Sequence, residues 1–117
     1  MNTRKAIWGK NFEAIERSLK EADPDLFRYI QEFAYDEVLS RPGLDLKTRE
    51  LLAITSLIAL GSPKELGTHI EGALRNGASE QEVRETIIQS ALFVGFPLAL
   101  GAMKMLQNLL RKRESSS

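Results

Sequence analysis

The sequence predicts an all-α domain of about six helices, and three observations carry this prediction. Apolar residues recur at helical spacing along most of the 117-residue chain, and no stretch alternates convincingly enough to be a strand. Ser62-Pro63-Lys64-Glu65 and Ser79-Glu80-Gln81-Glu82 have the form of capping boxes, which open helices. Asn76-Gly77 has the form of a helix end. A chain of this length fits one domain, 1–117, in which 1–22 holds an N-terminal helix.

The first two helices are expected over the N-terminal third of the chain. The first fits Arg4 to Glu21, where apolar residues lie near helical spacing. Asp23-Pro24 ends it and begins the second, with Asp23 as N-cap and Pro24 at the first helical position. Arg41-Pro42-Gly43 ends the second helix.

The third and fourth helices are expected in the middle of the chain. Asp45 caps the third, from Leu46 to Leu60, whose apolar residues lie almost all round it, as in a central helix. Gly61 ends that helix, and the Ser62 capping box opens the fourth, from Pro63 to Asn76.

The last two helices follow the second capping box. One runs from Ser79 to about Phe93, and Gly95-Phe96-Pro97 breaks the chain. The other runs from Pro97 to about Arg113 and keeps an apolar face of leucines and a methionine.

Composition excludes several classes of function. Sixteen basic and sixteen acidic residues give zero net charge, so no electrostatic footprint for nucleic acid or an anionic membrane is present. The longest apolar run, Ala91 to Met103, is shorter than the roughly 20 residues that span a bilayer and contains Pro97. The chain has no cysteine, which removes thiol chemistry, and no leader pattern is seen, so a cytoplasmic protein is expected.

His69, the only histidine, is the first candidate for chemistry, because an imidazole suits proton transfer at neutral pH. A lone histidine on a helix is also commonly a packed or surface residue. Glu50 is the second candidate, nineteen residues earlier at the start of an apolar helix, where a carboxylate would orient or deprotonate an imidazole. Its alternative role is a favourable charge in the first turn of that helix.

Glu65 has two competing interpretations. It completes the capping box with Ser62, which is the favoured role, and it lies four residues before His69, on the same helix face. No metal site is expected from one histidine with scattered acids, and no glycine-rich phosphate loop or dinucleotide motif indicates a cofactor.

Several motifs, in order, resemble the carboxymuconolactone decarboxylase-like family. They are Phe33 to Leu52, Leu57-Ile58-Ala59-Leu60-Gly61, His69, Ala73 to Ser79, and Ala91 to Pro97. The resemblance covers about 33–110 and implies an alkylhydroperoxidase D-like helical fold that assembles as a hexamer, a trimer of dimers. It also places Glu50 and His69 at the family's glutamate and histidine.

The resemblance separates two branches of chemistry. In the peroxidase branch two cysteines precede the histidine, and here Ser62 and Glu65 stand at those positions, so the thiol cycle cannot run. The other branch decarboxylates a carboxylated muconolactone without a cofactor, and Gly95-Phe96-Pro97 fits it better. Phe93 and Phe96 stand where decarboxylase members are associated with tyrosine and tryptophan, which leaves the substrate open.

The expected function is therefore that of a cofactor-free carboxy-lyase acting on a small carboxylated lactone. His69 and Glu50 are the expected catalytic residues. The expected substrate-binding residues are Arg49, Glu65, Phe93 and Phe96, with surface charge or a subunit ion pair as the alternative role of Arg49. The rival hypothesis is a non-catalytic oligomeric member that binds a partner or a small molecule.

Overall fold

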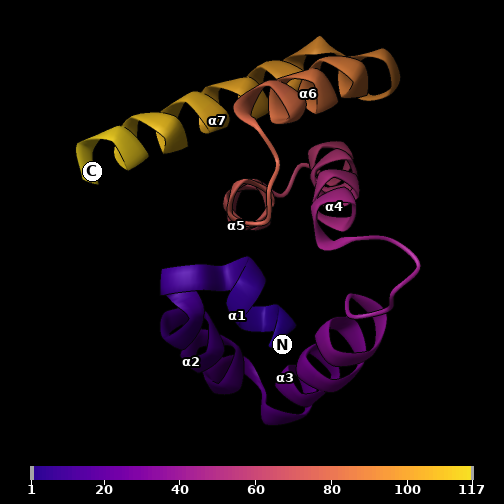
Figure 1. Cartoon of the computed structure of the whole chain (residues 1–117), viewed down its shortest axis with the longest axis vertical. Coiled ribbons are helices and arrows are strands. Elements are labelled where there is room, and N and C mark those ends of the chain that lie inside the picture. Colours follow the sequence, from indigo (N-terminus) through magenta and orange to yellow (C-terminus); the bar gives the residue numbers. More distant parts are fainter. Residues whose placement is uncertain (1, 117) are drawn as a thin grey trace.

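The computed structural model describes residues 2–116, and every regular element in that range is helical (Figure 1), which confirms the all-α prediction. The elements are α1 (Thr3–Trp8), the 3-10 segment η1 (Gly9–Asn11), α2 (Phe12–Ala22), α3 (Pro24–Tyr29), the π-helical segment η2 (Ile30–Val38), α4 (Leu46–Leu60), α5 (Pro63–Arg75), α6 (Glu80–Val94) and α7 (Phe96–Ser116).

The helices form three tiers, as Figure 1 shows. Helices α6 and α7 pack on each other along one side, α4 and α5 form the middle tier, and α1 to η2 lie on the other side. The main core lies between the middle tier and the α6–α7 pair. Its largest fully buried members are Ile54, Ile58, Ile70, Val83, Ile87 and Leu106.

Local capping signals place most helix starts where the sequence predicts them. The Asp23 side chain accepts a hydrogen bond from the Leu26 amide at 2.8 Å, and that of Asp45 accepts one from the Thr48 amide at 2.8 Å. The Ser79 capping box is complete. Helix α4 has the predicted bounds because Asp45 caps its start and Gly61, at φ 68°, ends it.

The capping box predicted at Ser62 is wrong. The Ser62 side chain makes no capping hydrogen bond, and its amide donates to the Leu57 carbonyl at 3.2 Å, in the motif that ends α4 at Gly61. This amide is the donor that a capping box would offer to Glu65. The motif that ends α4 thus uses the Ser62 amide that Glu65 would have bonded at the start of α5. Glu65 therefore has no capping role.

The predicted N-terminal helix is interrupted at Gly9, where the chain takes φ +55°. The backbone angle favours glycine here, and a Cβ atom would also have to displace the Arg75 side chain. The predicted second helix continues from α3 into η2, where the winding widens and the Leu39 amide donates to the Ala34 carbonyl.

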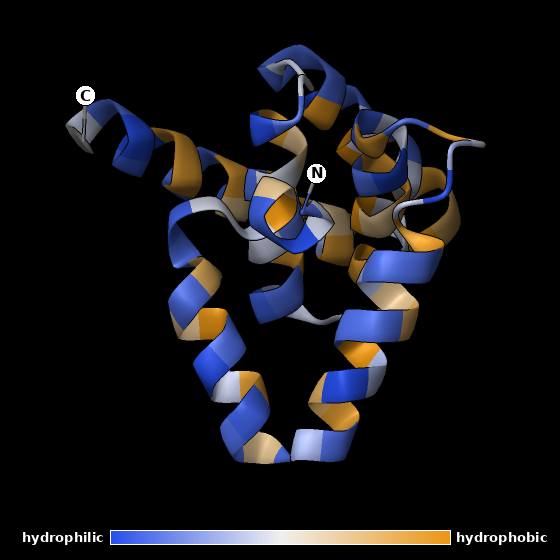
Figure 2. Cartoon of the chain, turned by 60° about the horizontal axis from the view of Figure 1, so that its bottom comes forward, coloured by the Kyte–Doolittle hydropathy of each residue, from blue (hydrophilic) through white to orange (hydrophobic). Residues whose placement is uncertain are grey.

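Helices α2 and α3–η2 diverge from their junction at Asp23 like the arms of a V (Figure 2). Their inner faces form a second cluster around Ile7, Trp8 and Tyr35, which partly buried side chains of both arms contact. Helix α1 contacts α5, α2 and η2, so it lies between the V and the middle tier.

Helix α4 is buried on one face only, whereas its apolar residues, which lie almost all round it, predicted a central helix. Glu50, Ile54 and Ile58 face the interior, whereas Leu52 and Leu60 are exposed. Two helices differ slightly from their expected bounds. Helix α5 ends at Arg75 and not at Asn76, and α7 runs from Phe96 to Ser116 and not from Pro97 to about Arg113. Within 2–116, no helix is long and apolar enough to cross a membrane.

Candidate active site

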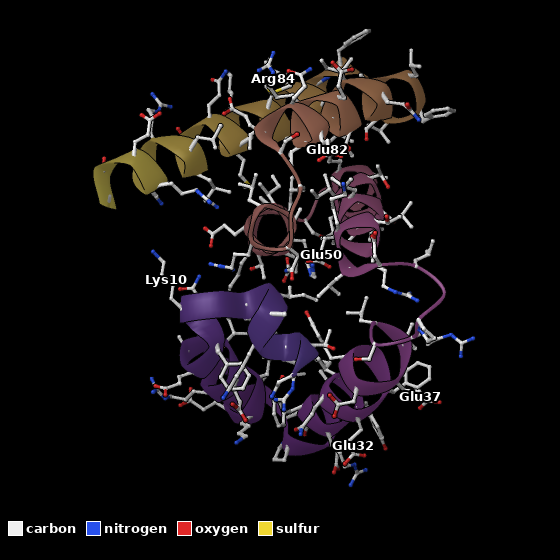
Figure 3. All side chains as sticks on the ribbon, viewed as in Figure 1. Lys10, Glu32, Glu37, Glu50, Glu82 and Arg84 are labelled. Atoms are coloured by element: carbon white, nitrogen blue, oxygen red, sulfur yellow. The ribbon has the colours of Figure 1, made fainter. Side chains whose placement is uncertain are left out.

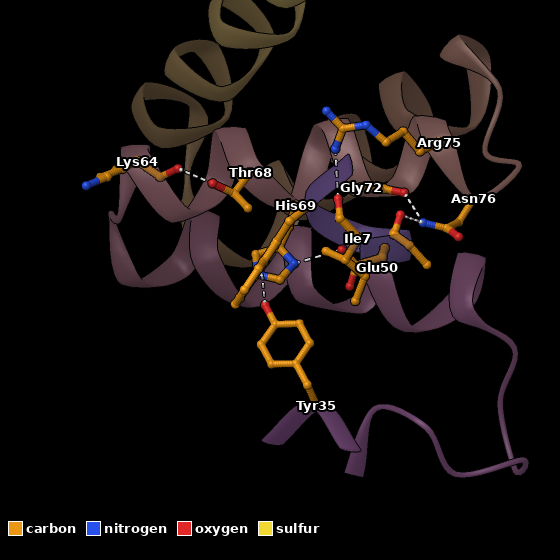
Figure 4. Close-up of polar contacts among 11 residues, drawn as sticks. Ile7, Tyr35, Glu50, Lys64, Thr68, His69, Gly72, Arg75 and Asn76 are labelled. Atoms are coloured by element: carbon orange, nitrogen blue, oxygen red, sulfur yellow. Dashed lines mark hydrogen bonds and ion pairs between the residues drawn. The ribbon is translucent and has the colours of Figure 1, made fainter. Parts of the chain in front are cut away.

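The structure brings His69 and Glu50 into direct contact (Figure 4). Glu50 lies in the second turn of α4 and His69 in the second turn of α5, and these two helices pack side by side. His69 Nδ1 lies 2.8 Å from Glu50 Oε1. The Glu50 side chain is fully buried, whereas that of His69 keeps 16% of its surface exposed. A buried carboxylate therefore holds an imidazole that solvent or a ligand can reach.

The chemistry of Glu50 indicates which atom of the His69–Glu50 contact donates the hydrogen bond. Figure 3 shows Glu50 inside the fold, while Glu32 and Glu37 lie at the outside. An ionised carboxylate only accepts hydrogen bonds, so Nδ1 donates and Nε2 is left for other partners. The second oxygen, Oε2, is buried and has no hydrogen-bond partner among the described residues. His69 is thus the one hydrogen-bond partner of this buried carboxylate among the described residues.

Gly72 makes room for this carboxylate. A Cβ atom at residue 72 would lie 2.5 Å from Glu50 Oε1 and 2.9 Å from Ile7 Cγ2. Contacts under 3.0 Å are not sustained by real Cβ atoms, so any side chain here displaces one neighbour or both. The glycine lets α4 and α1 approach the same point of α5.

A cavity of about 520 Å³ lies beside His69, between the arms of the V and the first turns of α5. This volume is within the range of small-molecule sites. Glu65 lies four residues before His69, and both line the cavity. The remaining lining residues are Trp8, Asn11, Ala14, Ile15, Ser18, Leu19, Ile30, Tyr35, Lys64 and Thr68.

Helix α1, which carries Trp8 of the cavity wall, is held by hydrogen bonds from the C-terminal end of α5. Arg75 Nη1 donates to the Ile7 carbonyl at 2.8 Å, and Asn76 Nδ2 donates to the Ala6 carbonyl at 2.9 Å. These carbonyls belong to the last turn of α1, where a helix leaves its acceptors unpaired. Arg75 and Asn76 therefore position α1, and with it the side chain of Trp8.

Tyr35 and Trp8 form a polar contact in the wall of the cavity. Trp8 Nε1 donates to the Tyr35 hydroxyl at 3.0 Å, and both residues are buried. The pKa of Tyr35 is raised to about 12, because the effect of burial, together with the negative charge of Glu50, outweighs the lowering effect of the Trp8 hydrogen bond. The phenol is thus neutral throughout the physiological range.

Three predicted binding residues lie outside this cavity. The Arg49 guanidinium donates to the carbonyls of Leu44 and Arg41, at 3.1 and 3.0 Å, and so holds the loop before α4. Phe93 lines a different cavity, between α4 and α6, and Phe96 lies at the start of α7. Their exposed fractions are 81% and 75%. Within 2–116, no group of three or more histidine and acidic side chains is arranged to hold a metal ion.

Sequence reasoning missed the residues that complete the cavity, above all Trp8 and Tyr35. Gly9 was the available signal, because an isolated glycine inside a helical pattern weakens the helix there. The pairing of Trp8 with Tyr35 spans 27 residues and depends on how α1 meets η2, which no local pattern specifies.

Comparison with known proteins identifies a family whose profile matches most of the chain. Residues 24–108 match the profile of the Carboxymuconolactone decarboxylase family. The matched range includes Tyr35, Glu50 and His69, but it begins after α1 and α2, which supply much of the cavity wall.

Individual relatives match over most of the chain. A 4-carboxymuconolactone decarboxylase of Acinetobacter baylyi is 36% identical over 94 residues, which cover 80% of this chain and 70% of the relative. A nitrosuccinic acid decarboxylase of Metarhizium robertsii is 34% identical over 113 residues, 94% of this chain and 78% of the relative. An uncharacterised 15.0 kDa protein of Paracoccus denitrificans is 30% identical over 100 residues, covering 84% and 75%.

Proposed function

The chain belongs to the carboxymuconolactone decarboxylase family, and from this premise we propose that it decarboxylates a small carboxylated lactone, or a related small acid, without a cofactor. The observation that carries the proposal is the His69–Glu50 pair beside a cavity of small-molecule size. Two relatives that are named as decarboxylases of small acids support the reaction class.

The proposed chemistry needs one proton and no electron acceptor from outside. As the bond to the departing carboxylate breaks, its electron pair moves into the conjugated system of the substrate, and a carbon atom then takes up a proton. His69 supplies that proton from Nε2, and Glu50 holds the ring through Nδ1. The apolar side chains of Ile15, Leu19 and Ile30 leave the departing carboxylate poorly solvated.

Thiol peroxidase chemistry is excluded for the isolated chain. It has no cysteine, so it has no thiolate to attack a peroxide and no disulfide to recycle. Glu65, at one of the positions where the peroxidase branch has cysteine, instead lines the cavity with His69, and we propose that it contacts the substrate.

The test of the proposed function is release of carbon dioxide from a panel of carboxylated lactones and β-keto acids. Binding can be followed in parallel by fluorescence, because Trp8 is the only tryptophan and lines the cavity. Turnover above the uncatalysed rate for at least one acid is expected. Binding without turnover across the panel would favour the non-catalytic hypothesis.

The Glu50→Gln variant is expected to lose less activity than variants of His69 itself. Glutamine keeps the shape and an acceptor oxygen for Nδ1, but it removes the negative charge of the carboxylate that holds the ring. We expect kcat to fall about tenfold, roughly one step of 1.4 kcal/mol. Steady-state kinetics measure this effect, and an unchanged kcat would mean that Glu50 has only a structural role.

We also propose that the protein is a homo-oligomer, a hexamer built as a trimer of dimers. Large apolar side chains are exposed where α4, α6 and α7 come together; they are Leu52, Leu60, Ile88, Leu92, Phe93, Phe96, Leu98 and Leu100. Apolar patches of this kind are typical of interfaces. In such an assembly Arg49, Phe93 or Phe96 would reach the substrate from a neighbouring subunit.

Light scattering at micromolar concentration tests this assembly. The intact chain is expected to have several times the mass of one 13.1 kDa subunit. Phe93→Glu places a charge in the exposed apolar patch and is expected to lower the mass, whereas Glu85→Gln on the same helix is the control. A monomeric wild-type protein would contradict the proposal.

A further inference from the structure

We propose that the Tyr35 hydroxyl, oriented by Trp8, donates a hydrogen bond to the substrate oxygen on which negative charge accumulates as carbon dioxide leaves. This inference rests on the proposed decarboxylation and adds a second functional group to the His69–Glu50 pair. In this reading Tyr35 contacts the substrate, and Trp8 is a positioning residue.

The hydrogen-bond geometry leaves the phenol proton available. Trp8 Nε1 occupies one lone pair of the Tyr35 oxygen at 3.0 Å, and the indole has no other hydrogen-bonding group. The hydrogen bonds of residues 2–116 give no acceptor for the hydroxyl hydrogen itself. Tyr35 and His69 line the same cavity, and in Figure 4 the Tyr35 hydroxyl points toward the part of α5 that carries His69.

The protonation state of Tyr35 suits a donor and not a base. With its pKa raised to about 12 by burial, the phenol keeps its hydrogen at any pH at which the protein would work. A hydrogen bond that the oxygen accepts also polarises its own O–H bond, which makes the hydroxyl a better donor. The nearby apolar side chains of Ile15, Leu19 and Ile30 strengthen such a bond further.

The donor would act at one step of the reaction. When the carbon–carboxylate bond breaks, the electron pair moves through the conjugated system to a carbonyl oxygen and forms an enolate. Tyr35 shares its hydrogen with that oxygen and keeps it. The electron pair returns when His69 delivers its proton to carbon, and His69 then regains a proton from water, so that atoms and charge balance. A donor placed where charge develops lowers the barrier without tightening substrate binding equally.

Tyr35→Phe tests the proposal, and Tyr29→Phe is the matched control. The chain has two tyrosines, and Tyr29 is exposed outside the cavity. We expect Tyr35→Phe to lower kcat roughly 10²–10³-fold with little change in KM, as for loss of one oxyanion donor. Trp8→Phe keeps the phenol and loses its orientation, so a smaller loss is expected. Tyr29→Phe is expected to keep the wild-type kcat.

A binding experiment gives a readout that does not depend on turnover. The probe is 3-nitropropionate, whose nitronate is a planar anion with charge on its nitro oxygens, like an enolate; the carbon-protonated form is its control. Quenching of Trp8 fluorescence reports binding of both forms. Wild type and Tyr29→Phe are expected to prefer the nitronate, and Tyr35→Phe is expected to lose that preference.

The outcomes separate this inference from the proposed function. If no acid is decarboxylated but the nitronate preference depends on Tyr35, the proposed function fails and the donor role stands. If wild type is active and Tyr35→Phe matches Tyr29→Phe in kcat and in nitronate preference, the inference is overturned and the proposed function stands. A loss that only follows the folded fraction at the assay temperature, or wild type without nitronate preference, also overturns it.

Discussion

Replacement of His69 by glutamine is expected to lower kcat for carbon dioxide release by roughly 10²–10⁴-fold, the usual contribution of general acid–base catalysis. Glutamine can still donate to Glu50 Oε1, which His69 now contacts at 2.8 Å, but it cannot deliver a proton to carbon. The fold should survive, because the His69 side chain is partly exposed and lies outside the main core. Circular dichroism and thermal unfolding check this point.

A double variant that combines His69→Gln with Glu50→Gln tests whether the two residues act as a unit. If Glu50 acts only through the imidazole, its replacement should cost almost nothing once His69 has gone, so the two effects should be far from additive. Additive losses would mean that the two residues act separately. Full activity of His69→Gln on a verified substrate would place the proton donor elsewhere.

Gly72→Ala is expected to weaken both the fold and the reaction. The new methyl group would lie 2.5 Å from Glu50 Oε1 and 2.9 Å from Ile7 Cγ2, so it must displace the carboxylate, helix α1 or both. Overpacking of this kind costs about 1–3 kcal/mol of unfolding free energy. A shift of the pair by about 1 Å would also lower kcat, by up to roughly 10²-fold. Chemical denaturation and steady-state kinetics measure the two effects.

Gly101→Ala in α7 is the matched control for this substitution. Nothing lies within 4 Å of a Cβ atom at that position, and the residue is inside a helix. Alanine there is expected to raise the unfolding free energy by about 0.5–1 kcal/mol and to leave kcat unchanged. Equal behaviour of the two variants would show that the close packing at Gly72 does not support the pair.

The sequence alone predicts the helices that are controlled by local signals. Helix α4 has the expected bounds because the Asp45 cap and the Gly61 stop both act within one turn. The pairing of Glu50 with His69 also follows from local structure, because their helices are joined by a two-residue turn and must pack side by side. Their roles in chemistry remain proposals.

Where prediction failed, a more distant or competing interaction decided the structure. At Ser62 two valid local motifs needed the same amide, and the one that ends α4 used it. The N-terminal helix has good apolar spacing, yet it stops at Gly9, where Arg75 fills the space beside the backbone. The cavity depends on contacts such as the hydrogen bond of Arg75 to Ile7, 68 residues away, and periodicity carries no record of them.

The cavity draws its walls from two stretches of the chain. Glu50 and His69 lie inside the range 24–108 that the family profile describes, whereas Trp8, Ile15 and Leu19 come from the segment before it. Substitutions in that segment reshape the space offered to an acid without touching His69 or Glu50. Under the proposed function, the N-terminal segment would therefore set which acids fit the cavity, and His69 with Glu50 would set the reaction that takes place there.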